Sequence, residues 1–446
     1  MLPVFENIIE QAAVLQLKDD ILRERRAPSM LFYGPPESGK GSASLELARV
    51  LSCEKGGDWK CSCPSCERHR YLQHDDLLVL GPRSFQAEIS ATLSAFLRNP
   101  GVSGAKLLFY RAIRKLQIRF SPVLMEDDPK AGKIAPVLQS LEEGLDEFLR
   151  INTQTAEKAA LEKKCAALVK DALVLESEGQ GGAIPVGRIR RACYWCRIAP
   201  NGKRKTLIIE NAENMREEAR NSLLKLLEEP PDTVCIVLTA QRREAIMATI
   251  LSRLRPYRFL KRSAESEKEV IRRVFQDTVN EEIGGTGGSV LSAYLDSFIA
   301  RGAEKMYPLA AWFIVSLARS ASVYAKKNAG AVPRFVNALG ERYAPIAGDC
   351  GLPRVVKDTD MARTLLAQSG NFEDDSFSRF LKICLDLTGA FTRETGDPQF
   401  IAYNGIFKKH IGEAVTAVDI LNQSTTLALE ALFHKLKKDI IRGINV

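Results

Sequence analysis

One stretch of the sequence has the residue types and spacing of a phosphate-binding loop. It follows an apolar run, Met30 to Tyr33, and precedes a helical pattern, Ser42 to Leu51. Glycines in this setting let backbone N–H groups turn around a phosphate at a helix N-terminus, and the lysine reaches the β- and γ-phosphates. The strand–loop–helix context favours this interpretation over a glycine-rich turn with an incidental lysine. The predicted ATP or ADP site consists of Gly34, Pro35, Pro36, Glu37, Ser38, Gly39, Lys40, Gly41 and Ser42.

The position after the lysine lacks a hydroxyl group. A Ser or Thr there coordinates Mg²⁺ in nucleotide-hydrolysing enzymes, whereas this chain has Gly41. Ser42 is one residue late, about 100° further round the helix, and is expected to point away from a metal. The loop is therefore compatible with nucleotide binding, and Gly41 argues against Mg²⁺-assisted hydrolysis.

A second group of residues has the character of a metal site. Four cysteines lie within fourteen residues: Cys53, Cys61, Cys63 and Cys66. Four thiolates this close in a reducing compartment suit a tetrahedral Zn²⁺ with no open position, which would stabilise a loop rather than catalyse. Unliganded cysteines are the alternative. His69 and His74 lie nearby, but four thiolates already complete the shell. The remaining cysteines are interpreted as core residues: Cys165, Cys193, Cys196, Cys235, Cys350 and Cys384.

Short apolar runs must position these residues. Four runs read as buried strands: Met30 to Tyr33, Leu77 to Leu80, Thr206 to Ile209 and Val234 to Leu238. Helical patterns between them predict an α/β layer with a parallel sheet. From about 84 to 182 the pattern becomes helical and charged, and we interpret this stretch as an insertion, a helical hairpin projecting from the core. A solvated pair of charged helices with no chemistry is the alternative.

Composition limits the class of protein. With 446 residues, of which 45% are hydrophobic and 26% charged, the chain builds cores in two to four domains. No run approaches the ~20 uncharged apolar residues of a membrane span, and the N-terminus lacks the pattern of an export signal. We therefore expect a cytoplasmic protein without a membrane partner. A net charge of +8 favours a polyanionic partner such as nucleic acid.

The segment from Thr206 to Phe259 resembles bacterial clamp-loader AAA+ subunits, the delta-prime and gamma/tau subunits of the DNA polymerase III holoenzyme. It contains a buried strand, a helix ending in Leu-Leu-Glu-Glu-Pro-Pro, another strand, and then Thr-Ile-Leu-Ser-Arg. Phe5 to Gln11 is similar to their N-terminal box, although Glu10 stands where a glycine is usual. His74-Asp-Asp76 is similar to their His-Pro-Asp, and the four-cysteine knot resembles theirs, with one residue fewer between Cys61 and Cys63. The resemblance covers 3–82 and 183–260.

The resemblance implies a domain plan. It implies an AAA+ domain over 1–260 with the zinc knot, a helical lid over 261–305, and a helical collar for oligomerisation over 306–446. The 84–182 insertion has no counterpart in it, and our hypothesis is that this insertion docks another replication protein.

The departures from the family pattern bear on activity. Motor subunits end the second signature strand in Asp-Glu, for Mg²⁺ and for the attacking water, whereas this chain has Glu210 and Asn211. Glu210 could still contact a metal as a degenerate member of this pair, but the amide of Asn211 cannot act as a base. The polar sensor falls near Thr239 to Gln241. Ser252-Arg253 is retained, and in the family this arginine is a finger that enters the neighbouring subunit's ATP site.

The resemblance implies a delta-prime-like subunit that completes a neighbour's active site and does not catalyse alone. Its partners would be the gamma/tau and delta subunits in a hetero-pentamer, the sliding clamp, and primer–template DNA. Lys203, Arg204 and Lys205 either solvate a turn, which we favour, or contact DNA phosphates. The alternatives are a gamma/tau-type ATP-hydrolysing motor, a stand-alone P-loop NTPase, and a zinc-stabilised DNA-binding protein without a nucleotide role.

Overall fold

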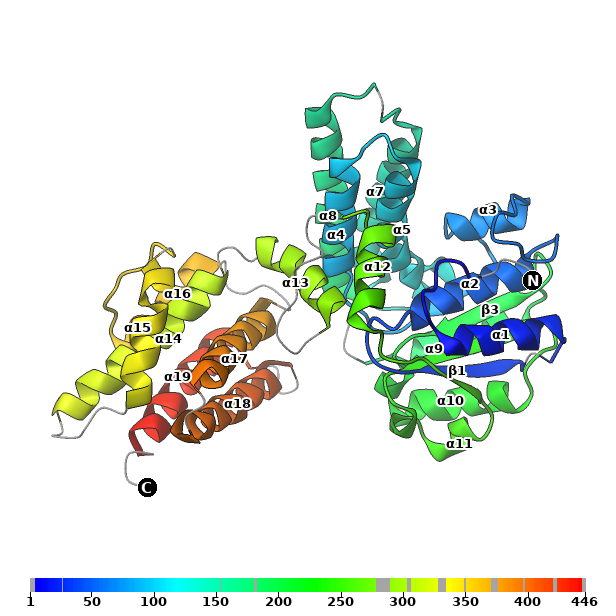
Figure 1. The fold of residues 1–446 in the computed structure, drawn as a ribbon. Coiled ribbons are helices and arrows are strands. Elements are labelled where there is room, and N and C mark those ends of the chain that lie inside the picture. The colour runs from blue at the N-terminus through cyan, green and yellow to red at the C-terminus, as the bar shows by residue number, and fades with distance from the viewer. Residues whose placement is uncertain are drawn as a thin grey trace. The chain divides into compact units, whose positions relative to one another are not determined.

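The computed structural model describes residues 5–25, 27–153, 155–179, 183–277, 289–302, 306–327, 334–348, 350–369, 376–395, 398–419 and 423–442. By its contacts the chain divides into two compact units, Met1–Ile299 and Ala300–Val446. The first unit carries a parallel sheet with helices on both faces, and the described residues of the second unit form helices and loops (Figure 1). The predicted C-terminal end of the insertion, 180–182, lies outside the described residues.

The first unit is built on a five-stranded parallel sheet, which confirms the predicted α/β class. The strand order is β2-β3-β4-β1-β5. The strands are β1 (Ser29–Tyr33), β2 (Leu77–Leu80), β3 (Lys205–Ile209), β4 (Val234–Ala240) and β5 (Arg255–Arg258). β5 was not among the predicted strands, because its sequence Arg-Pro-Tyr-Arg has no apolar run. It pairs only with β1, at the edge of the sheet, where a proline is tolerated.

Alternate side chains of each strand pack on opposite faces of the sheet. Met30 and Phe32 of β1 pack with α1 (Ala12–Leu22) and α2 (Lys40–Ser52). Leu31 packs on the other face with α9 (Val186–Arg197) and α10 (Glu217–Glu228). Figure 1 shows α2 on one side of the strands and α10 on the other. Burial on both faces explains why the central strands read as continuous apolar runs.

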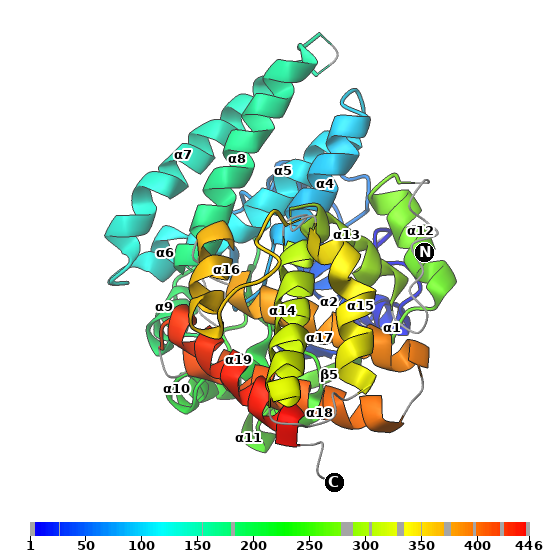
Figure 2. The same cartoon turned by 90° about the vertical axis from the view of Figure 1, so that its left-hand side faces the viewer.

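The predicted insertion is larger than one hairpin. Its helices are α4 (Gln86–Arg98), α5 (Ser103–Gln117), η1 (Ile118–Phe120), α6 (Pro122–Met125), α7 (Ala131–Arg150) and α8 (Lys158–Gly179). They enclose a core of their own, in which Phe96, Phe109 and Phe148 contact one another. Figures 1 and 2 both show α7 and α8 side by side, extending away from the sheet. The stretch is therefore neither a simple hairpin nor a solvated helix pair, but a packed layer of helices.

Two further helices pack on this layer. α12 (Ala264–Val274) and α13 (Val290–Gly302) belong to the stretch predicted to be a lid. Ile271 of α12 and Tyr294 of α13 are buried together with Ala91 of α4. The phenol of Tyr294 also donates a hydrogen bond to Asp277 over 3.1 Å.

The second unit has one hydrophobic core. Its helices are α14 (Met306–Lys327), α15 (Arg334–Gly348), η4 (Asp358–Asp360), α16 (Met361–Ser369), α17 (Ser376–Thr395), α18 (Pro398–Asp419) and α19 (Thr425–Arg442). Among the described residues, Met306–Ala325 is the one stretch long and apolar enough to cross a membrane by length and composition, which the sequence analysis did not anticipate. Its Trp312 and Phe313 lie in the core of this unit, so we interpret α14 as a core helix.

Candidate nucleotide and metal sites

The phosphate-binding loop lies where the sequence predicts it, between β1 and the N-terminus of α2. Gly34 has φ +152°, and a Cβ atom there would overlap the backbone of Phe259, which follows β5. Gly39 caps α2 with φ +95°, in the left-handed region that favours glycine. These two glycines bring the loop close to the sheet and turn it into the helix. The strand–loop–helix course is the one that a phosphate-binding loop requires.

Lys40 is held by the loop itself. Its ammonium group donates to the carbonyl oxygens of Gly34 over 2.7 Å and Pro35 over 2.5 Å, and to Ser38 Oγ over 3.3 Å. Burial is the largest influence on the pKa of Lys40 and lowers it to about 8, although nearby glutamates act in the opposite direction. To bind a phosphate, Lys40 must exchange these three acceptors for phosphate oxygens. Arg262 also contacts the loop, by donating to the carbonyl oxygen of Glu37.

Glu210 follows β3 at the carboxyl edge of the sheet and is buried among cations. Its carboxylate accepts a hydrogen bond from Arg119 of η1 and lies 3.6 Å from Arg83, three residues after β2. Burial alone would raise the pKa of Glu210, but Arg119 and then Arg83 outweigh it and lower this pKa. Glu210 is therefore a carboxylate with its charge already balanced.

Arg83 also pairs with a second carboxylate. Glu88 of α4 accepts from Arg83 over 2.6 Å and is also paired with Lys115 of α5. We call Arg83, Glu88, Lys115, Arg119 and Glu210 the charge cluster. Sequence reasoning missed four of its five members. Of these four missed residues, only Arg83 had a signal in the sequence. It follows a predicted strand, at the edge where ligands bind in open α/β sheets.

Asn211 is fixed by backbone contacts. It adopts φ 50° and ψ 53°, a left-handed conformation that asparagine tolerates. Its side-chain amide donates to the carbonyl oxygen of Pro82 over 2.7 Å, and its backbone N–H donates to Thr239 Oγ1 over 3.1 Å. Thr239, near the end of β4, thus lies beside the end of β3. The amide has no proton-accepting nitrogen, so it offers no base for a water molecule.

The residues at the loop do not fit a catalytic Mg²⁺. The metal would need a hydroxyl at position 41 and a free carboxylate at position 210. Instead, a Cβ atom at Gly41 would lie 2.7 Å from Glu210 Oε1 and 3.3 Å from Arg83 Nη1. The space between loop and strand is therefore taken by a carboxylate and a guanidinium group. A catalytic Mg²⁺ therefore does not fit beside the loop.

Arg253 lies at the protein surface, just after the short helix α11 (Ala248–Leu251). Its guanidinium donates to the carbonyl oxygen of Thr249 over 2.5 Å and pairs with Glu228 over 2.6 Å. Glu228 is the last residue of α10, in the Leu-Leu-Glu-Glu-Pro-Pro segment. These contacts hold the arginine at the surface with its side chain about one third exposed. Such an arginine is accessible to a second molecule.

The four predicted cysteines come together. Their sulfur atoms all lie within 4.8 Å of one another, and Cys53 Sγ is 3.6 Å from Cys61 Sγ and 3.9 Å from Cys63 Sγ. Four sulfurs about 2.3 Å from a tetrahedral Zn²⁺ are about 3.8 Å apart. Cys53 follows the last residue of α2, whereas Cys63 and Cys66 begin α3 (Pro64–Arg70). The geometry therefore fits a metal ion held between these two helices.

Two hydrogen-bond donors contact the cysteine sulfurs. Arg49 of α2 donates to Cys66 Sγ over 3.0 Å and is itself paired with Glu46 over 2.7 Å. The backbone N–H of Lys55 donates to Cys53 Sγ over 3.3 Å. A neighbouring cation and a hydrogen-bond donor both stabilise a negatively charged sulfur. The metal site is thus tied to the same helix that begins at the phosphate-binding loop.

Two nearby predictions have different outcomes. The rings of His69 and His74 stack on each other with centroids 4.1 Å apart, and neither belongs to the cysteine group. The expectation that this basic stretch solvates a turn is wrong for Lys205, which is buried, whereas Lys203 is exposed. Lys203 donates to the carbonyl oxygen of Cys53 over 3.0 Å, and Lys205 is buried beneath Trp195. Both cations secure local backbone or aromatic groups.

The remaining cysteines match the prediction of core thiols. Five are buried, and the sixth, Cys193, is half-buried: Cys165, Cys196, Cys235, Cys350 and Cys384 are the buried ones. Burial raises the pKa of Cys196 to about 12 and that of Cys193 to about 11. Thiols with raised pKa values are poor nucleophiles near neutral pH. The Cys-x-x-Cys pair of α9 is therefore structural.

Comparison with known proteins identifies the family. A family model described as "DNA polymerase III, delta subunit" matches residues 9–121 and 151–263, just over half of the chain. The delta-prime subunit of DNA polymerase III from Bacillus subtilis is 30% identical over 107 residues, which cover 23% of this chain and 32% of that protein. The chain thus spans about a third of the length of the curated relative it matches.

A solved structure of a DNA polymerase III gamma subunit-related protein from Thermotoga maritima is also similar. The similarity covers 58% of this chain and 81% of that one, at 19% identity and a TM-score of 0.29. The family model leaves 122–150 unmatched, which contains α6 and α7. The part without a counterpart is therefore shorter than the predicted insertion of 84–182. The chain belongs to the DNA polymerase III delta subunit family of clamp-loader proteins.

Proposed function

We propose that this chain is a non-motor, delta-prime-like subunit of the DNA polymerase III clamp loader. In this role it helps to load the sliding clamp onto primed DNA and donates Arg253 to the ATP site of a neighbouring subunit. The contrast between Glu210 and Arg253 carries the proposal. Glu210 is buried and paired with Arg119, whereas Arg253 is held at the surface. The chain's own metal position is closed while its arginine is available to a partner.

The cofactors and partners follow from this role. The four-cysteine site would hold a structural Zn²⁺, for which four thiolates at tetrahedral spacing are the preferred ligands. The phosphate-binding loop would hold ATP or ADP without hydrolysing it. Gamma/tau and delta subunits would complete the hetero-pentamer through the helical second unit, near the sliding clamp and primer–template DNA in the cytoplasm. The net charge of +8 supports a position near DNA.

The gamma/tau-type motor and the stand-alone NTPase both require metal-dependent hydrolysis. Such hydrolysis needs a position for Mg²⁺ between the loop and Glu210, and the Arg83 guanidinium lies there beside the Glu210 carboxylate. It also needs a group that orients or activates water, and Asn211 is bonded to the carbonyl oxygen of Pro82 instead. These contacts favour the non-motor role.

The test combines the isolated chain with the assembled complex. We expect the isolated chain to show no ATP turnover, with or without primed DNA. We also expect Arg253→Ala to abolish turnover at the adjacent motor site, because arginine fingers contribute about 10³–10⁵ in rate. Arg243→Ala, which removes another exposed arginine close in sequence, serves as the matched control. Turnover by the isolated chain that Lys40→Ala eliminates would show instead that the chain is a motor.

A further inference from the structure

We propose that Arg83 and Arg119 replace the divalent cation beside the phosphate-binding loop, so that the helical insertion is anchored on the carboxylate that would otherwise hold a metal. This inference concerns the chain's own residues and deepens the proposed non-motor role. It also explains why position 41 is glycine.

The space beside position 41 of the loop is occupied by side chains of the charge cluster. A side chain at position 41 would collide with Glu210, since its Cβ atom would lie 2.7 Å from Oε1. Arg83 Nη1 would lie 3.3 Å from the same Cβ atom and is 3.6 Å from that carboxylate oxygen. A guanidinium group thus contacts both the loop position and the strand position that share Mg²⁺ in a hydrolysing enzyme.

The charge cluster has a net positive charge. The charge cluster holds three cations and two carboxylates, and each carboxylate is paired with two of the cations. Net positive charge in a buried setting repels a divalent cation, since charges interact strongly where water is excluded. The cluster therefore satisfies Glu210 without a metal and opposes the entry of one.

One aromatic ring contacts both arginines. Both guanidinium groups lie over the ring of Phe85, at 5.1 Å for Arg83 and 4.5 Å for Arg119. Phe85 is fully buried, and its backbone N–H donates to Glu176 of α8 over 2.9 Å. The fixed ring, with a cation–π contact to each arginine, restricts both side chains. They act as permanent parts of the site.

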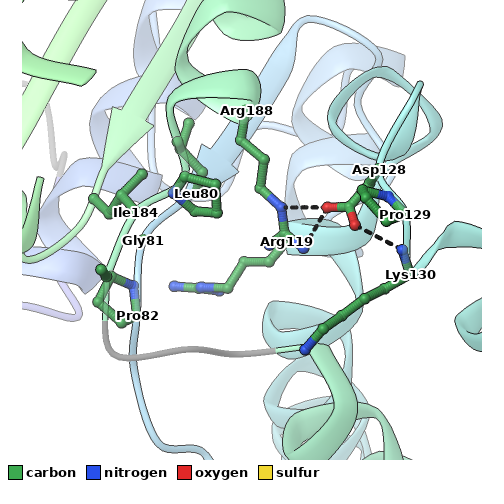
Figure 3. A pocket seen from close by; sticks show the side chains of 11 residues that line it. Leu80, Gly81, Pro82, Arg119, Asp128, Pro129, Lys130, Ile184 and Arg188 are labelled. Atoms are coloured by element: carbon green, nitrogen blue, oxygen red, sulfur yellow. Dashed lines mark hydrogen bonds and ion pairs between the residues drawn. The ribbon is translucent and has the colours of Figure 1, made fainter. Parts of the chain in front are cut away.

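Arg119 is paired with Glu210. This arginine lines a pocket of about 320 Å³, whose wall also contains Asp128 and Arg188. Figure 3 shows the Arg119 guanidinium turned toward Pro82, while Asp128 is paired with Arg188. Two insertion residues thus take separate partners on the core, and Arg119 is committed to Glu210. Through this pair, η1 is attached to the end of β3.

Mn²⁺ binding to the isolated, zinc-loaded chain tests the proposal by electron paramagnetic resonance, with and without ADP. We expect the wild-type chain to bind Mn²⁺ no more tightly than its Glu210→Gln variant. We expect Arg83→Gln/Arg119→Gln to gain a site at least tenfold tighter, and Glu210→Gln to remove this gain. Arg188→Gln, which removes an arginine from the same pocket, should leave Mn²⁺ affinity at the wild-type level. A Glu210-dependent Mn²⁺ site in the wild-type chain, or no gain in the double variant, would overturn the proposal.

If the double variant does not fold, a second measurement tests the proposal without it. Gly41→Ala should lower the melting temperature of the wild-type chain by several degrees, because the added methyl group collides with Glu210. The same change should cost markedly less in a Glu210→Ala background. Equal losses in both backgrounds would contradict the inferred packing. Neither measurement involves Arg253 or a second subunit, so the inference and the finger-donor role fail independently.

Discussion

Replacing Glu88 by glutamine should weaken the attachment of the insertion to the sheet. Glu88 lies on α4 and pairs with Arg83 and Lys115, so the substitution leaves two cations of the charge cluster without this partner. Glutamine keeps the size of the side chain and mimics its protonated form. The change therefore measures what the negative charge contributes.

The magnitude follows from the pKa of this carboxyl group. Burial alone would raise the pKa of Glu88, but Lys115 and Arg83 outweigh it and lower this pKa from 4.5 to about 2. At about 1.36 kcal/mol per pKa unit, the charge contributes about 3 kcal/mol to the free energy of unfolding at pH 7. Because the folded pKa is depressed, the contribution is present above pH 4.5 and is lost as the pH falls toward 2. At pH 3 less than half of it should remain.

The assay is urea unfolding followed by tryptophan fluorescence. The chain has three tryptophans: Trp59 and Trp195 in the first unit and Trp312 in the second. A Trp312→Phe background makes the signal specific to the first unit, which matters because two units need not unfold together. Glu162→Gln is the control, since Glu162 forms an exposed pair with Lys158 on α8. Exposed pairs contribute only about 0–1 kcal/mol.

Two results would refute this reasoning. A difference between wild type and Glu88→Gln below about 1 kcal/mol at pH 7 would mean that the cluster is no stronger than a surface pair. A difference that stays the same from pH 7 to pH 3 would mean that the cost comes from altered packing rather than from charge.

Two further predictions concern other parts of the first unit. Cys63→Ser should leave the purified chain with less than one zinc per molecule and lower the melting temperature of the first unit, as metal analysis and thermal unfolding would show; full zinc retention would contradict the four-thiolate site. Tyr257→Phe should cost about 1.5–3 kcal/mol, because the buried phenol donates to the Asp20 carboxylate over 2.8 Å. In urea unfolding the exposed Tyr194→Phe control should cost nothing measurable, and equal effects would argue against the Asp20 bond.

Local patterns made much of the fold predictable. The central strands are buried on both faces, so each appears as an apolar run that the sequence alone reveals. The phosphate-binding loop and the four cysteines are each contained within fourteen residues or fewer, so their spacing already carries the geometry. These features need no knowledge of distant contacts.

The rest depended on contacts that spacing does not show. Arg119 and Glu210 are separated by 91 positions, and an arginine in a charged helical stretch reads as a solvated residue. The core of the insertion was missed for a related reason, since Phe96, Phe109 and Phe148 are spread among many charged side chains. β5 escaped because an edge strand needs fewer apolar residues than a central one.

The α7–α8 pair of the insertion is long enough for a small rotation at its base to move its far end by several ångströms. α7 has 20 residues and α8 has 22, so at 1.5 Å per residue the pair is about 30 Å long. Near its base, Glu176 of α8 accepts from the backbone N–H of Phe85, which precedes α4, and Arg119 of η1 joins this helical layer to Glu210 at the end of β3. A rotation of about 10° about that base moves the far end by about 5 Å for a helix pair of this length. A movement of the pair as one body would reach the end of β3 through the contact between Arg119 and Glu210.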